Sequence, residues 1–141
     1  MILLDTNVLI YAFTPTSPFC QWAQETIAEA VAGEGAAINA VSLAEICVGE
    51  AEPSTVADRI RQWGVAILDV PAASADICAR AYQSYRQRRV AQSTSAAPPM
   101  PLPDFFIGAH AAMMGWDIAT VDRGRFQTYF PAVSLQTPLE V

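Results

Sequence analysis

Short apolar segments alternate with helical segments along the whole chain, and this alternation constrains the fold more than any other feature of the sequence. The expected strands are residues 2–4, 36–40, 66–70 and 117–121, with an edge strand at 133–135. Helices are expected at 21–32, 42–50, 54–63, 74–89, 103–114 and 125–129. Apolar strands separated by helices are typical of a parallel sheet covered on both faces. We therefore predict an α/β fold with three layers, α/β/α, around a short central parallel sheet of four or five strands.

The chain length of 141 residues suits a single domain, which we place at residues 1–141. No internal repeat is visible. The stretch VAQSTSAAPPMPLP is rich in small polar residues and proline, and such a segment contributes little to a core. We therefore expect a mobile loop at about residues 90–103.

Hydrophobic residues make up 52% of the chain, and the mean hydropathy is +0.25. No apolar run approaches the roughly 20 residues that span a bilayer, and the N-terminus lacks the features of a signal peptide. We therefore expect a cytoplasmic protein without a membrane partner, whose excess apolar surface binds a partner or a second copy. The three cysteines are widely spaced and predict free thiols: Cys20, Cys47 and Cys78.

The formal net charge is −6, although nucleic-acid binding normally requires a basic surface. The distribution of charge is more informative than the sum. All eight basic residues are arginines, and none lies in the first 58 residues. They form three groups: Arg59 with Arg61, residues 80–89, and Arg123 with Arg125.

Four acidic residues lie where a parallel sheet would gather them. Asp5 follows the first strand, Glu45 lies in the first turn of the helix after the second, and Asp122 follows the fourth. Asp104 begins the helix that leads into the fourth strand. Because ligands of such sheets bind beyond the carboxyl ends of the strands, topology alone brings three of these four carboxylates together. Asp117, which starts a strand, is expected at the opposite edge.

Each of the four acids also has a purely structural interpretation. Glu45 and Ser42 fit the S-x-x-E pattern of a capping box. Asp104 could favour a helix start, Asp122 could be a turn residue, and Asp5 could cap a helix that begins near Asn7. Local capping, however, gives no reason for the four to converge on one edge.

The chemistry of the acids favours a divalent cation. Hard oxygen ligands suit Mg²⁺ or Mn²⁺, which can activate water for attack on phosphorus. A ribonuclease without metal usually needs two acid–base groups, often histidines, and this chain has a single one, His110. His110 follows Asp104 by six residues, or about 240° around a helix, so it is expected to point away and to be structural or exposed.

Four segments, taken in order, resemble the signatures of PIN-domain ribonucleases of the VapC toxin type: LLDTNVLIYAF, VSLAEI, LPDFFIGAHA and IATVDRGRF. The resemblance implies a PIN-like nuclease domain whose catalytic, metal-binding residues are Asp5, Glu45, Asp104 and Asp122, with Asn often standing at the last position in the family. It implies a toxin of a toxin–antitoxin pair, an Mg²⁺- or Mn²⁺-dependent endoribonuclease with an RNA substrate, a cognate antitoxin and a homodimeric state. Substrate contacts are expected at Asn7, Thr120, Arg123 and at Arg125, which borders the same site.

Three other interpretations were weighed. A receiver-type phosphoacceptor requires a lysine at the acidic edge, and this chain has none. A HAD-type phosphatase requires a second aspartate two residues after the first, where this chain has Asn7. The remaining alternative is a non-catalytic α/β binding module whose acidic residues are helix caps. Three large aromatic side chains are candidates for contact surfaces, although burial in the core is the more common fate of such residues: Phe19, Trp22 and Trp63.

Overall fold

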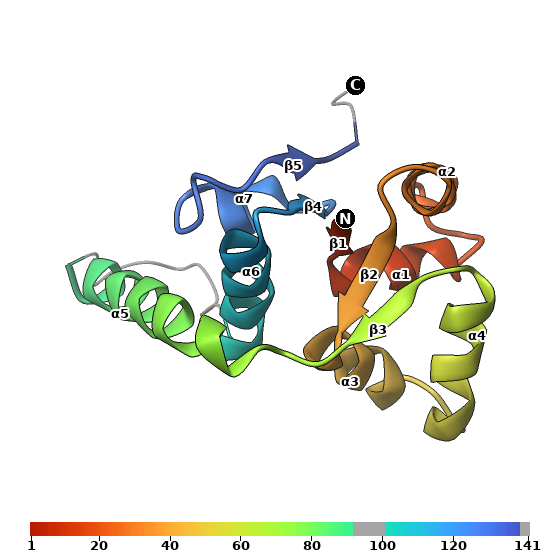
Figure 1. The fold of residues 1–141 in the computed structure, drawn as a ribbon, viewed down its shortest axis with the longest axis horizontal. Helices are drawn as coiled ribbons and strands as arrows, with labels where there is room; N and C mark the ends of the chain where they lie inside the picture. Colours follow the sequence, from red (N-terminus) through yellow and green to blue (C-terminus); the bar gives the residue numbers. More distant parts are fainter. Residues whose placement is uncertain (92–100, 139–141) are drawn as a thin grey trace.

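A computed structural model of the chain describes residues 1–91 and 101–138. Its centre is a five-stranded parallel sheet with the strand order β3-β2-β1-β4-β5 (Figure 1). The strands are β1 (Ile2–Leu4), β2 (Ala36–Asn39), β3 (Ala66–Leu68), β4 (Asp117–Ala119) and β5 (Leu135–Gln136). The predicted α/β class and the number of strands are confirmed.

Seven α-helices connect and cover these strands in the described part of the chain. They are α1 (Thr6–Ala12), α2 (Cys20–Ala32), α3 (Ala40–Val48), α4 (Val56–Gln62), α5 (Ala75–Ala91), α6 (Leu102–Met114) and α7 (Arg123–Gln127). In Figure 1, α1, α2 and α4 lie to one side of the sheet, and α5, α6 and α7 lie to the other. Within the described ranges, no helix combines the length and apolar character that crossing a membrane requires.

Alternate residues of the central strands enter two separate hydrophobic cores, which gives the molecule its three layers. Leu4 and Ala119, which are paired between β1 and β4, pack with the buried side chains of α1, α2, α3 and α4. Leu3 and Ile118, the preceding pair, pack with those of α5, α6 and α7. Successive strand residues point to opposite faces, so both must be apolar when both faces are covered. This requirement explains the uninterrupted apolar runs in the sequence.

The start of α3 differs from the prediction. The helix begins at Ala40 rather than at residue 42, because Asn39 is its N-cap. Asn39 Oδ1 accepts hydrogen bonds from the backbone N–H groups of Val41 at 3.0 Å and of Ser42 at 3.2 Å. The predicted helix start at Ser42 is therefore wrong, and the alternative interpretation of Glu45 as part of a capping box at Ser42 does not apply.

The two helices that flank the proline-rich segment extend into the loop that was predicted at about residues 90–103. Residues 90 and 91 belong to α5, and residues 102 and 103 belong to α6. Pro103 in the first turn of α6 is compatible with a helix, because the backbone N–H that proline lacks has no intrahelical partner there. The mobility predicted for this loop concerns mainly residues 92–100, which lie outside the described residues.

The position of α6 is fixed by a close approach at Gly108. A Cβ atom added there would overlap the ring of Phe130, which follows α7. Only glycine allows this contact, and interiors are packed tightly enough that the ring has little room to retreat. The contact sets α6, which carries Asp104, against the segment that contains α7.

Candidate active site

The structure brings the four predicted carboxylates to the carboxyl edge of the sheet. Asp5 directly follows β1, Asp122 follows β4 by three residues, Glu45 lies in α3 after β2, and Asp104 lies in the first turn of α6. They are close enough to interact, because the charges of Asp5, Glu45 and Asp122 each raise the pKa of Asp104. Asp117 starts β4 and so lies at the opposite edge, as expected.

Asp5 is completely buried and has two roles in the structure. Its Oδ1 accepts the backbone N–H of Thr6 at 2.8 Å, which caps α1. Its Oδ2 accepts the hydroxyl of Thr120 at 2.8 Å, and Thr120 Oγ1 accepts the backbone N–H of Asp122 at 3.0 Å. Burial raises the pKa of Asp5, although the hydrogen bond from Thr120 and the charge of Arg125 oppose it. The cap and the site interpretations of Asp5 are therefore compatible.

Glu45 is exposed and is held across the β1–α1 junction by a hydroxyl. Thr6 Oγ1 lies 2.8 Å from Glu45 Oε1 and 3.1 Å from Ser42 Oγ. The charged carboxylate is the better acceptor for the Thr6 proton. Thr6 was missed as a site residue, although it stands in the polar Asp-Thr-Asn interruption of the first apolar run.

Asp104 is a buried carboxyl group whose pKa is strongly raised. Its side chain is 3% exposed, and burial raises its pKa from 3.8 to about 6, with the charge of Arg125 opposing and the other three acids adding to the rise. Burial disfavours the charged form, and neighbouring negative charges do the same. Strongly perturbed acids that converge in this way are characteristic of functional sites.

One guanidinium lies between two of the acids. Arg125 Nη1 is 3.2 Å from Asp104 Oδ1, and Arg125 Nε is 3.4 Å from Asp122 Oδ2. Arg125 is 32% exposed and Asp122 is 49% exposed, so the buried end of this bridge is Asp104. The sequence placed Arg125 at the border of the site, and the structure places it within the acidic cluster.

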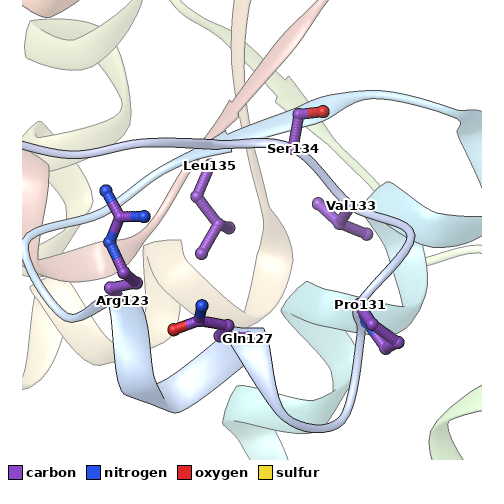
Figure 2. A pocket seen from close by; sticks show the side chains of 6 residues that line it. All are labelled: Arg123, Gln127, Pro131, Val133, Ser134 and Leu135. Atoms are coloured by element: carbon purple, nitrogen blue, oxygen red, sulfur yellow. The ribbon is translucent and has the colours of Figure 1, made fainter.

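The other predicted substrate-binding residues surround this cluster. Asn7 Oδ1 accepts the backbone N–H of Val121 at 3.4 Å, which ties α1 to the end of β4. Arg123 donates to Thr137 Oγ1 at 2.8 Å and lines a hollow of about 430 Å³ between α7 and β5. In Figure 2 its side chain extends from the start of α7 toward the segment that carries Leu135. Arg123 therefore lies beside the acidic cluster and not within it.

His110 belongs to the buried framework behind the site. It is 2% exposed, and its Nδ1 lies 3.2 Å from Asn39 Nδ2. Because Asn39 Oδ1 faces two backbone N–H groups, its amide nitrogen faces the ring, so His110 Nδ1 is the acceptor and the imidazole is neutral. Burial lowers the pKa of His110, which agrees with this assignment. The pair joins the start of α3 to α6, the helices of Glu45 and Asp104.

The donor set fits a hard divalent cation in its chemistry. Carboxylate oxygens are the ligands that Mg²⁺ and Mn²⁺ prefer, and burial together with three neighbouring acids raises the pKa of Asp104 against the opposing charge of Arg125. Over residues 1–91 and 101–138, however, no three acidic, histidine or cysteine side chains already form a cluster that could hold a metal ion. Arg125 stands where the oxygens of Asp104 and Asp122 would have to meet a cation.

Comparison with solved structures shows the same fold in several of them. The VapBC2 complex of Rickettsia felis, bound to a DNA fragment from its promoter, matches with a TM-score of 0.63 and 20% identity over 97% of this chain and 98% of that one. FitAcB of Neisseria gonorrhoeae matches with a TM-score of 0.63 and 24% identity over 96% of both chains. A toxin–antitoxin complex from Klebsiella pneumoniae matches with a TM-score of 0.66 and 21% identity over 100% of both.

The sequence itself also matches a protein family. No match was found among curated protein sequences. The family model of the PIN domain, in contrast, matches residues 2–130, a range that includes all four carboxylates and every strand except β5. Since this range covers most of the chain, the protein belongs to the PIN domain family.

Proposed function

We propose that this chain is an Mg²⁺- or Mn²⁺-dependent endoribonuclease that hydrolyses RNA phosphodiester bonds, and that it is the toxin of a toxin–antitoxin pair. The observation that carries the proposal is the convergence of Asp5, Glu45, Asp104 and Asp122 on one edge of the sheet, where two of them are almost fully buried. Membership of the PIN domain family, whose members are generally nucleases, supports the same activity.

In this proposal the four carboxylates are the metal ligands and form the catalytic centre. A bound divalent cation supplies Lewis acidity that polarises a phosphate oxygen and acidifies water. Two hydroxyl groups of the chain orient the ligands: Thr120 holds Asp5, and Thr6 holds Glu45. Such partners fix the rotamer of a ligand and are nearly as important as the ligand itself.

The substrate contacts we propose are Asn7, Arg123 and Arg125, whereas Thr120 is fully buried and acts by holding Asp5. Arg123 is the best placed to meet RNA outside the acidic cluster, because its guanidinium is exposed and lines the hollow shown in Figure 2. Guanidinium groups bind phosphate in a forked geometry. Two arginines at this edge would supply positive charge locally in a protein whose net charge is −6.

For partners we propose a cognate antitoxin and a second copy of the chain, with the protein acting in the cytoplasm. The matching structure from Klebsiella pneumoniae is a toxin–antitoxin complex, which supports the first. Large apolar side chains at the surface support the second: Val48 on α3 is 88% exposed and Ile10 on α1 is 44% exposed. Phe19, Trp22 and Trp63 are half-buried, and Trp22 and Trp63 pack against the first core.

The experiment that tests the proposal is RNA cleavage with and without metal. The purified protein is expected to cleave single-stranded RNA in Mn²⁺ or Mg²⁺, to stop in excess EDTA, and to recover when Mn²⁺ is added back. Fragments are followed on a denaturing gel. Cleavage that persists undiminished in EDTA would refute the metal-dependent mechanism, and a purified protein that cuts no RNA under any of these conditions would favour the binding module.

A further inference from the structure

Arg125 makes contacts that a simple substrate-binding residue would not make. Its guanidinium reaches two carboxylates that belong to different elements, Asp104 at the start of α6 and Asp122 just before α7. The Asp104 end of this bridge is buried, with 3% of the side chain exposed. A positive charge of the chain itself therefore lies inside the acidic cluster.

Arg125 and a divalent cation would compete for the same two carboxylates. Asp104 Oδ1 points a lone pair at Arg125 Nη1 from 3.2 Å, and Asp122 Oδ2 is 3.4 Å from Arg125 Nε. A divalent cation on these carboxylates would lie within a few ångströms of the guanidinium, where like charges repel strongly because the site is only partly solvated. Each positive group therefore weakens the binding of the other to these carboxylates.

Arg125 has room to leave, whereas Asp104 does not. The arginine side chain is 32% exposed and stands on α7, a helix of five residues near the surface. Asp104 is held in the first turn of α6, a helix fixed by the close contact between Gly108 and Phe130. A change of rotamer at Arg125 would open Asp104 and Asp122 without any movement of the backbone.

We propose that Arg125 is an exchangeable counterion, which neutralises Asp104 and Asp122 in the metal-free protein and leaves them when a divalent cation binds. This inference rests on the proposed function. It is compatible with a contact between Arg125 and substrate phosphate, because the released guanidinium remains at the same edge of the sheet. The rival interpretation is a permanent clamp, in which Arg125 holds the carboxylates in the positions that a metal requires.

The two interpretations predict changes of opposite sign in metal affinity. Arg125→Gln removes the competing charge, so we expect the dissociation constant for Mn²⁺ to fall about tenfold, while the melting temperature in EDTA decreases because Asp104 and Asp122 lose their counterion. The matched control is Arg123→Gln, which removes the same charge two residues away, from a guanidinium that bonds to Thr137. The dissociation constant of Arg123→Gln for Mn²⁺ should stay within about twofold of the wild-type value. Isothermal titration with MnCl₂ measures all three proteins.

An unchanged or weaker affinity in Arg125→Gln would overturn the exchange and leave the proposed function intact. The absence of Mn²⁺ binding to both wild type and Arg125→Gln would overturn the proposed function, and the exchange with it. A second measurement follows Arg125 in the wild-type protein, so it does not depend on the stability of Arg125→Gln. In NMR spectra the Arg125 Nε–H signal, assigned by its loss in Arg125→Lys, should move toward the position of a free arginine as Mg²⁺ saturates the protein. A signal that does not move at saturation would overturn the exchange.

Discussion

Asp104→Asn is expected to abolish RNA cleavage, with a loss of at least about 100-fold, and to remove most of the thermal stabilisation that Mn²⁺ gives the wild-type protein. The substitution keeps the shape of the side chain but removes a buried anionic ligand that is 3% exposed. Ligand groups and the residues that orient them typically account for effects of this size, and loss of binding removes the stabilisation by mass action. Cleavage rates and melting temperatures with and without Mn²⁺ provide the measurement.

Asp117→Asn is the matched control, because Asp117 starts β4 and lies at the opposite edge of the sheet. It should retain wild-type cleavage and the wild-type metal shift. Asparagine is as good a residue as aspartate near a helix start. An Asp104→Asn protein that is active and keeps its metal shift would therefore show that Asp104 is only part of the helix terminus, and the proposed ligand set would fail.

Asp104 is also expected to make the metal-free protein less stable at neutral pH than at mildly acidic pH. In the folded protein its pKa is about 6, against 3.8 in its ordinary state. Between these values the native state holds a proton that the unfolded state has lost, so this contribution to stability is present below about pH 4 and disappears as pH rises through 6. The displacement corresponds to roughly 3 kcal/mol at most, at about 1.4 kcal/mol for each pKa unit.

The comparison with Asp104→Asn measures the effect of the Asp104 charge together with its interaction with Asp5. The raised pKa of Asp5 acts in the same direction, and the charge of Asp5 adds to the raised pKa of Asp104, so the two groups are not independent. In EDTA, the difference in free energy of unfolding between the two proteins should be smallest near pH 4, and the variant should be the more stable at pH 7.5. Urea denaturation at several pH values measures the difference. A difference that is independent of pH would contradict the buried, charge-crowded environment described for Asp104.

The layers of the fold were readable in the sequence because burial on both faces leaves uninterrupted apolar strands, such as Ile2–Leu4. The start of α3, in contrast, was not predicted correctly from the sequence. The pattern S-x-x-E pointed to Ser42, whereas Asn39 caps the helix and its amide also contacts His110, which lies 71 residues further along the chain. A local pattern contains no information about a partner so distant in sequence.

The candidate site likewise has features that the sequence predicts and features that it does not. The convergence of Asp5, Glu45 and Asp122 follows from the rule that parallel strands end at one edge, so it could be predicted without coordinates. The resemblance placed Thr120 at the site, but the hydrogen bonds of Thr6 and Thr120 could not be predicted, because they span 39 and 115 residues. The reach of Arg125 to Asp104 likewise depends on how α6 and α7 pack, which the chain order does not specify.

The chemistry of the RNA ends tests the central claim most directly. If water activated at the carboxylate cluster cleaves the bond, the products should carry 5′-phosphate and 3′-hydroxyl ends, and RNA with a single 2′-deoxy substitution at the scissile nucleotide should still be cut. Mass spectrometry of the fragments, made in Mn²⁺ by the wild-type protein, distinguishes the outcomes. Products with 2′,3′-cyclic phosphate ends, together with resistance of the 2′-deoxy substrate, would show attack by the RNA hydroxyl and contradict the account.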